Sequence, residues 1–195
     1  MDNVYCYPGT DTLKNKLNIH EKDRLSEVEI RLTAIRLYQL QESPIQGKFD
    51  FAHLCNIHYH IFQNLYPWAG SVRTVNIAKG SMFCLVQHIR SYAQTIFPAY
   101  HEDCMRMKDD LERFIPVFTE YYANMNALHP FREGNGRAQR EFARGVCATC
   151  GYALDLRHTD HRKMLAGSIA SFDKGDNTGL EAIFQKCIRP LSSNL

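Results

Sequence analysis

Apolar residues recur at helical spacing along most of this chain, and one short stretch breaks the pattern. Residues 21–41 place Leu25, Val28, Leu32, Ile35 and Leu40 on a helical repeat, with acidic side chains early and arginines later, as a helix dipole favours. Comparable patterns predict further helices over 51–65, 89–101, 107–128, 137–150, 158–172 and 179–187. The sequence therefore predicts an all-α fold.

The interruption lies at residues 67–84, PWAGSVRTVNIAKGSMFC. Here β-branched residues surround a Lys79-Gly80-Ser81 turn, which is typical of a short hairpin. We expect one β-hairpin flap, spanning about residues 70–84, in an otherwise helical protein.

Composition limits the number of domains and the compartment. With 195 residues, of which 45% are hydrophobic, the chain can form one sizeable core, so we expect a single domain over 1–195. The N-terminus has no basic leader followed by an apolar region, and nowhere do about 18 apolar residues run together. Seven cysteines, an odd number, favour reduced thiols over a disulfide framework. These features predict a cytoplasmic protein that does not cross a membrane.

The segment HPFREGNGR at 129–137 connects two predicted helices and contains more glycine than a turn requires. Glycine lets the backbone approach a ligand closely, and free N–H groups at a helix N-terminus attract anions. Gly134, Asn135, Gly136 and Arg137 are therefore expected to form an anion cradle. Arg137, Arg140 and Arg144 follow along one helix face, which suits a polyphosphate.

Two further residues of this segment suggest chemistry. Glu133, an acid among cationic groups, is a candidate ligand for a Mg²⁺ ion that bridges phosphates. His129 has the pKa range of a general base for a hydroxyl group. The residues alone fit a tight turn beside a solvated arginine face equally well, because short glycine loops before helices are common.

The complete string HPFREGNGRAQR resembles the signature of the Fic (filamentation induced by cAMP) family, HPFx[D/E]GNGRxxR. The similarity extends to the opening YPGTDTLKNKL, the PWAG-x-x-R segment at 67–73 and the Ile77-x-Lys79-Gly80 hairpin. This resemblance implies a Fic-type helical domain whose motif loop, 129–140, lies next to the flap. It also implies a protein adenylyltransferase that moves AMP from ATP to a hydroxyl side chain of another protein.

The resemblance assigns a role to each residue of the motif. His129 would deprotonate the target hydroxyl, Phe131 would anchor the loop in the core, and Glu133 would hold Mg²⁺ on the ATP phosphates. Arg137 would bind near the β-phosphate and Arg140 at the γ-phosphate, above an anion hole made by residues 134–136. The flap would dock the target segment by main-chain pairing, through the residues Ile77, Ala78, Lys79 and Gly80.

The resemblance also bears on the reaction type and on regulation. The Doc branch of this fold, which phosphorylates its target, has lysine at the position of Gly136, so glycine favours AMP transfer. Many Fic proteins contain an inhibitory helix, [S/T]-x-x-x-E-[G/N], but here the one Glu followed by Gly or Asn is Glu133 itself. We therefore expect a toxin whose partner is a small antitoxin protein that inserts a Glu near Arg140.

The target cannot be deduced from the sequence. By resemblance to small bacterial Fic toxins, DNA gyrase and topoisomerase IV are candidates, and the alternatives are a secreted effector that modifies host proteins or a Doc-like kinase. Two other kinds of site were weighed. Cys147, Cys150, His158 and His161 are zinc-ligand types, but their spacing is shorter than in common zinc fingers. A nucleic-acid surface is disfavoured by 23 basic against 21 acidic residues, a net charge of +2.

Overall fold

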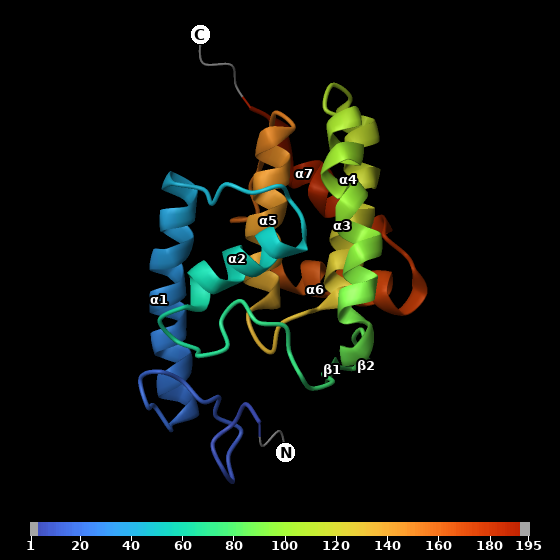
Figure 1. Ribbon diagram of the computed structural model, residues 1–195. Coiled ribbons are helices and arrows are strands. Elements are labelled where there is room, and N and C mark those ends of the chain that lie inside the picture. Colours follow the sequence, from blue (N-terminus) through green and yellow to red (C-terminus); the bar gives the residue numbers. More distant parts are fainter. Residues whose placement is uncertain (1–3, 192–195) are drawn as a thin grey trace.

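Figure 1 shows the arrangement of helices and strands in the computed structural model, which describes residues 4–191. Both ends of the predicted 1–195 domain thus lie outside the described residues. The helices are α1 (Lys22–Glu42), α2 (Phe51–Phe62), α3 (Ile89–Arg106), α4 (Leu111–Leu128), α5 (Asn135–Thr149), α6 (His161–Lys174) and α7 (Thr178–Cys187), with a 3₁₀ turn at Val86–His88. The strands are β1 (Ala78–Lys79), β2 (Ser81–Met82), β3 (Tyr152–Leu154) and β4 (Ile188–Pro190).

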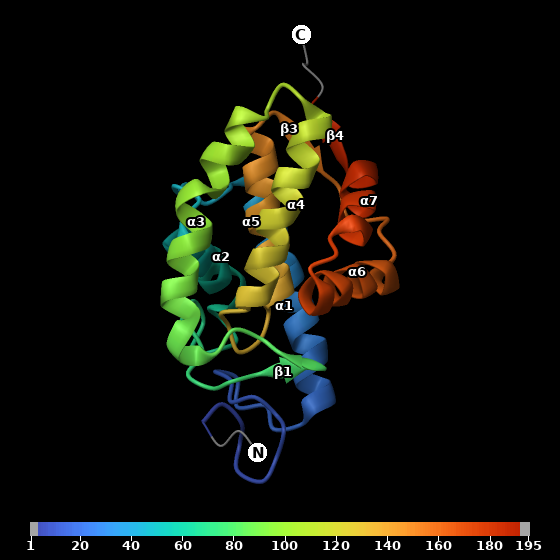
Figure 2. The same ribbon diagram turned by 90° about the vertical axis from the view of Figure 1, so that its right-hand side faces the viewer.

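Helix α5 runs through the centre of the molecule, and α2, α3 and α4 pack around it (Figures 1 and 2). Its buried face carries Ala138, Phe142, Ala143 and Val146, all with no exposed surface. The Phe142 ring meets the rings of Phe49, Phe97 and Tyr100 at centroid distances of 5.5–5.7 Å. Burial of such aromatic groups supplies most of the energy that fixes a helix in a core. The N-terminal end of α5 is thereby held in place.

The β-hairpin lies where the sequence predicts it, within an otherwise mostly helical fold. Strand β1 pairs antiparallel with β2, with Ala78 opposite Met82 and Lys79 opposite Ser81. Gly80, at φ +83°, forms the turn, a backbone conformation that most other residues avoid. The paired part is shorter than the predicted 70–84 segment, and the remainder of that segment is irregular.

A second two-stranded sheet was not predicted. Strand β3 follows α5 and pairs antiparallel with β4, which follows α7, with Ala153 opposite Arg189. Each strand has three residues. So short a strand carries no alternation that sequence analysis can detect, and its partner lies far away along the chain.

Several details of the predicted helices were wrong; for example, the helix predicted over 89–101 continues to Arg106. The helix predicted over 107–128 begins at Leu111, because the Asp110 side chain accepts a hydrogen bond from the Arg113 N–H and so caps its N-terminus. Ile35, counted above among the apolar positions of α1, is 56% exposed, while Thr33 is buried in its place. Among residues 4–191, no helix is long and apolar enough to cross a membrane.

Candidate active site

The loop between α4 and α5 carries the motif residues and is closed by its own side chains. His129 ends α4 in the left-handed conformation, φ 43°, and Gly134 precedes α5 at φ 79°. The Asn135 side chain accepts a hydrogen bond from the Phe131 N–H (2.8 Å) and donates one to the Phe131 carbonyl (2.7 Å). Because both polar atoms of the amide are used within the loop, Asn135 fixes the loop's shape.

Phe131 and His58 join this loop to α2. The Phe131 ring is fully buried and stacks on the His58 ring with centroids 3.8 Å apart. His58 Nδ1 accepts a hydrogen bond from the Gly70 N–H (2.8 Å), so Nε2 carries the proton and donates to the Glu133 carbonyl (2.9 Å). Burial lowers the pKa of His58 to about 4, with a smaller contribution from Arg137. His58 therefore supports the loop as a neutral ring, a role that sequence analysis missed.

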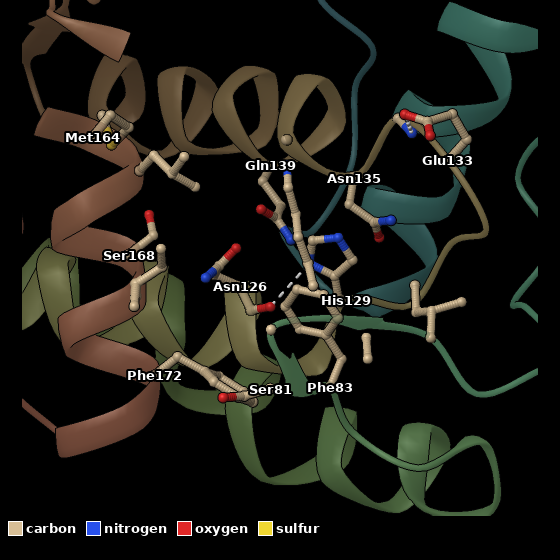
Figure 3. A pocket seen from close by; sticks show the side chains of 18 of the residues that line it. Ser81, Phe83, Asn126, His129, Glu133, Asn135, Gln139, Met164, Ser168 and Phe172 are labelled. Atoms are coloured by element: carbon tan, nitrogen blue, oxygen red, sulfur yellow. Dashed lines mark hydrogen bonds between the residues drawn. The ribbon is translucent and has the colours of Figure 1, made fainter. Parts of the chain in front are cut away.

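His129 is held in one orientation at the wall of a cavity (Figure 3). Its Nδ1 donates to the Asn126 carbonyl (3.1 Å), and its ring stacks on Phe83 at 3.8 Å with an interplanar angle of 12°. No described residue donates a hydrogen bond to Nε2, which keeps its lone pair. Burial, with help from Arg73 and Lys79, lowers the pKa of His129 to about 4, while the Asn126 contact opposes that shift. At neutral pH the ring is therefore an unprotonated base.

Glycine is required at the first position of the cradle. A Cβ atom at Gly134 would lie 2.1 Å from the Phe62 ring, whereas a Cβ at Gly136 would meet only the flexible end of the exposed Arg140 side chain, at 3.0 Å from Nη1. Within residues 4–191, no acceptor lies in hydrogen-bond range of the Asn135 and Gly136 amide N–H groups. These free donors stand at the positive end of α5, which is an arrangement that binds anions.

The cavity beside the cradle has a volume of about 470 Å³. The motif loop forms its polar wall, and the flap forms its rim. The opposite wall is the face of α6 with Met164, Leu165, Ile169 and Phe172, of which Leu165 and Ile169 are 39% and 47% exposed (Figure 3). Exposed apolar side chains opposite a phosphate cradle suit a flat aromatic base. Apart from the amphipathic pattern of α6, no feature of the sequence indicates this wall.

The structure brings most of the predicted site residues to this one cavity. It is lined by His129, Glu133, Gly134, Asn135, Gly136 and Arg140 from the motif, and by Ile77, Ala78, Lys79 and Gly80 from the flap. Phe131 lies behind the loop in the core. Arg140 is exposed and makes no ion pair or hydrogen bond with any described residue, so its charge is available to a ligand.

Arg137 is the predicted site residue that the structure places elsewhere. Its guanidinium does not line the cavity; it pairs with Glu29 of α1 and donates to Thr33 Oγ1 at 3.2 Å. The predicted contact of Arg137 with a phosphate stays a prediction, and in this structure it would require the guanidinium to leave Glu29.

Arg73 is a residue whose role sequence analysis missed, although it ends the PWAG-x-x-R segment. Its side chain is 2% exposed, and its guanidinium donates to the carbonyls of His129 (Nε, 2.9 Å), Val75 (Nη1, 2.8 Å) and Cys84 (Nη2). The flap is thus fastened to the motif loop at its base. Its tip is fastened to α6, where Ser81 Oγ donates to Asp173 Oδ1 at 2.6 Å.

Glu133 fits the role of a Mg²⁺ ligand. Its carboxylate is 45% exposed, lines the cavity and lies beside the free N–H groups of the cradle. Among the described residues no group of three or more His, Cys, Asp or Glu side chains could hold a metal, the four candidate zinc ligands included. A single carboxylate suits Mg²⁺ that takes its remaining ligands from phosphates and water.

Comparison with known proteins identifies the class to which this fold and site belong. The model of the Fic/DOC family matches residues 48–146. The chain belongs to the Fic/DOC family. It is 34% identical over 190 residues to the "Probable protein adenylyltransferase y4lH" of Sinorhizobium fredii, covering 96% of this chain and 97% of the relative.

Other relatives agree on the enzyme class and the fold. The "Protein adenylyltransferase VbhT" of Bartonella schoenbuchensis is 34% identical over 97% of this chain, which corresponds to 40% of that protein. The N-terminal Fic domain of a VirB-translocated Bep effector protein from Bartonella quintana, crystallised with bound ADP, superposes with a TM-score of 0.92 at 25% identity, covering 99% of this chain and 98% of that one. The predicted fold and enzyme class are confirmed: this chain is a protein adenylyltransferase.

Proposed function

We propose that this chain transfers AMP from ATP, with Mg²⁺, to a serine, threonine or tyrosine hydroxyl of a target protein and releases pyrophosphate. The observation that carries the proposal is the orientation of His129, whose Nε2 lone pair is free beside an anion cradle. ATP as the nucleotide is supported by the ADP-bound neighbour and by the apolar wall of α6, which suits an adenine base.

The proposed reaction uses the residues of the cavity as follows. The α-phosphate binds the free N–H groups of Asn135 and Gly136, and the γ-phosphate binds Arg140. His129 Nε2 takes the proton of the target hydroxyl while the hydroxyl oxygen forms a bond to the α-phosphorus. The bond from the α-phosphorus to the oxygen that bridges to the β-phosphate breaks, and pyrophosphate leaves. Mg²⁺ held by Glu133 would neutralise phosphate charge.

The flap supports main-chain docking of the target. Strand β1 is exposed and has one partner strand among the described residues, so its outer edge is open to another extended segment. Selection by the backbone positions a hydroxyl and places few demands on target sequence.

Labelling separates this reaction from its closest competitor. The purified chain is incubated with Mg²⁺, a bacterial lysate and ATP labelled at either the α- or the γ-phosphate. We expect protein labelled from α-labelled ATP, reduced at least about a hundredfold in His129→Ala. His88→Ala removes an exposed histidine outside the cavity and should keep full labelling. Label from the γ-phosphate alone would instead establish a Doc-like kinase and overturn the proposal.

We further propose that the chain is the toxin of a toxin–antitoxin pair. The support is Arg140, an exposed cation in the cavity with no acidic partner among the described residues, to which an antitoxin could present a Glu. Expression of the chain in bacteria should arrest growth, and expression of His129→Ala should not. Normal growth during expression of an active enzyme would overturn the proposal that the chain is a toxin.

DNA gyrase and topoisomerase IV are the first targets we propose, and the mass of the labelled protein tests this choice. The alternative, modification of host proteins, is favoured by one specific observation. The neighbours of known structure include VirB-translocated effectors of Bartonella. A labelled band in a host-cell lysate, with none in a bacterial lysate, would select the alternative.

A further inference from the structure

Helix α1 supplies an acidic residue to the back of the motif loop. The Glu29 carboxylate pairs with Arg137 Nη2 and accepts a hydrogen bond from the Tyr66 hydroxyl. The Glu29 and Arg137 side chains are 13% and 21% exposed, so this pair is largely shielded from water. The sequence separates the two residues by more than a hundred positions, and nothing in the motif indicates the contact.

The surroundings of this pair hold both partners in place. Thr33, one turn after Glu29, accepts a hydrogen bond from Arg137 Nη1 at 3.2 Å. The guanidinium carbon lies 4.7 Å from the centre of the Phe62 ring, the same ring that contacts Gly134. Burial and the adjacent Glu29 raise the pKa of Tyr66, so its hydroxyl stays protonated and keeps donating to Glu29.

A second carboxylate lies within reach of the same guanidinium. Glu133 Oε1 is 3.6 Å from Arg137 Nη2, beyond hydrogen-bond range, and it accepts a hydrogen bond from the Gly134 N–H at 2.8 Å. Arg137 therefore lies between Glu29 and Glu133 and is paired closely with Glu29, the more buried of the two. Glu133, which lines the cavity, remains only loosely engaged.

We propose that Glu29 is a positioning residue. It holds the Arg137 guanidinium against α1 and so leaves the Glu133 carboxylate free to bind Mg²⁺. This inference rests on the proposed role of Glu133. A partly buried guanidinium needs an anion. If Glu29 is neutral, Glu133 is the nearest acid left, and a close pair with Arg137 would occupy the oxygens that the metal requires.

The test measures metal binding directly, in addition to activity. Mn²⁺ serves as the probe, its binding followed by electron paramagnetic resonance in the presence of a non-hydrolysable ATP analogue. Glu29→Gln keeps the size of the side chain and removes its charge. We expect Mn²⁺ to bind about tenfold more weakly and the Mg²⁺ requirement for AMP transfer to rise in parallel. Glu27→Gln, on the same helix and exposed, is the matched control and should change neither.

Two further variants separate positioning from a general structural role. In Glu29→Gln/Arg137→Gln the competing guanidinium is absent, so Mn²⁺ affinity should match that of Arg137→Gln alone. Glu29→Asp keeps the charge and should bind Mn²⁺ more tightly than Glu29→Gln. Melting curves identify any variant that does not fold. If Glu29→Gln is one of these, Glu29→Asp is compared with wild type, and a large loss of Mn²⁺ affinity in a folded Glu29→Asp would overturn the inference. Three other results would overturn the inference. Mn²⁺ affinity could fall equally in Glu29→Asp and Glu29→Gln, it could stay unchanged in Glu29→Gln, or Glu29→Gln could lower it equally with and without Arg137.

Failure of the proposed function gives a different result. If Glu133 is not the metal ligand, wild-type protein and Glu133→Gln bind Mn²⁺ equally well. If Glu133 is the ligand and Glu29 has no positioning role, Glu133→Gln loses Mn²⁺ while Glu29→Gln keeps it.

Discussion

Arg73 Nε donates a hydrogen bond to the backbone carbonyl of His129 at 2.9 Å, and this contact joins the base of the flap to the histidine that we propose as the general base. The same guanidinium serves carbonyls of the flap, and the Arg73 N–H bonds to the Pro130 carbonyl (2.9 Å). One buried side chain therefore sets the position of the proposed base relative to the surface that would receive the target.

Replacing Arg73 should damage both stability and activity. Arg73→Met fills similar space but leaves three carbonyls without a donor, at a cost of about 3 kcal/mol or more in the free energy of unfolding. Arg73→Lys restores at most part of these hydrogen bonds, so its free energy of unfolding in urea should lie between those of Arg73→Met and wild type. Arg90→Met, at an exposed position, is the control and should be nearly neutral. Equal stability of Arg73→Met and wild type would contradict this account.

The pH dependence of AMP transfer should reflect the depressed pKa of His129. Because the ring acts as a base, kcat/KM increases as pH rises through that pKa, about 4, and should already be level by about pH 6. Lys79 lowers this pKa through its positive charge. Lys79→Gln should therefore move the acid limb to higher pH, while Lys48→Gln, exposed and outside the cavity, should not. An acid limb at the ordinary histidine pKa in wild type would argue against His129 as the buried base.

His58 predicts a loss of stability in mild acid. Its folded pKa, about 4, lies below the ordinary value of 6.5, so between these values the unfolded chain binds a proton that the folded chain does not. Stability should thus fall by roughly 1.4 kcal/mol per pH unit from this residue as pH decreases from 6.5 toward 4. His58→Gln should remove that part of the slope in unfolding experiments at several pH values. His88→Ala should retain it, and an unchanged slope in His58→Gln would show that other groups cause the acid sensitivity.

The hydrogen bond from Ser81 to Asp173 predicts a role in flap position. Asp173→Ala releases the flap tip from α6, and since the contact is exposed its loss should change overall stability by less than about 1 kcal/mol. The expected effect is a several-fold higher KM for the target protein with little change in KM for ATP. Asp109→Ala, which removes an exposed acid that does not line the cavity, provides the comparison. A rise in the KM for ATP alone would show that the contact does not position the flap for the target protein.

The features that could be predicted from the sequence have local causes. Helical periodicity, the Lys79-Gly80-Ser81 turn and the glycines of the motif loop act over a few residues, and the helices, the hairpin and the cradle follow from them. The features that could not be predicted depend on contacts between distant segments. The pairing of β3 with β4 and the wall that α6 contributes to the cavity have no local signature.

The same distinction explains which site residues were missed. His58 was not singled out from the sequence, because its role depends on Gly70 and Glu133, which the fold brings to opposite sides of its ring. Arg137 was assigned from the motif, and its partner Glu29 lies on a helix that the motif does not mention. A motif specifies the groups that face a ligand. The residues that hold those groups become visible only when the packing is known.

The two glycines Gly134 and Gly151 allow backbone strain to be separated from steric conflict at the cradle. Both have positive φ, 79° and 83°, so alanine at either position costs about 1–2 kcal/mol through the left-handed conformation. A Cβ at Gly151 meets no atom within 4 Å, whereas a Cβ at Gly134 would overlap the Phe62 ring. Gly134→Ala should therefore be the more destabilising by at least about 1 kcal/mol in urea unfolding. It should also abolish AMP transfer, because the loop that carries the free N–H groups must move, while Gly151→Ala stays active. Equal losses in the two variants would mean that conformation alone explains the glycine at 134 and that contact with Phe62 does not shape the cradle.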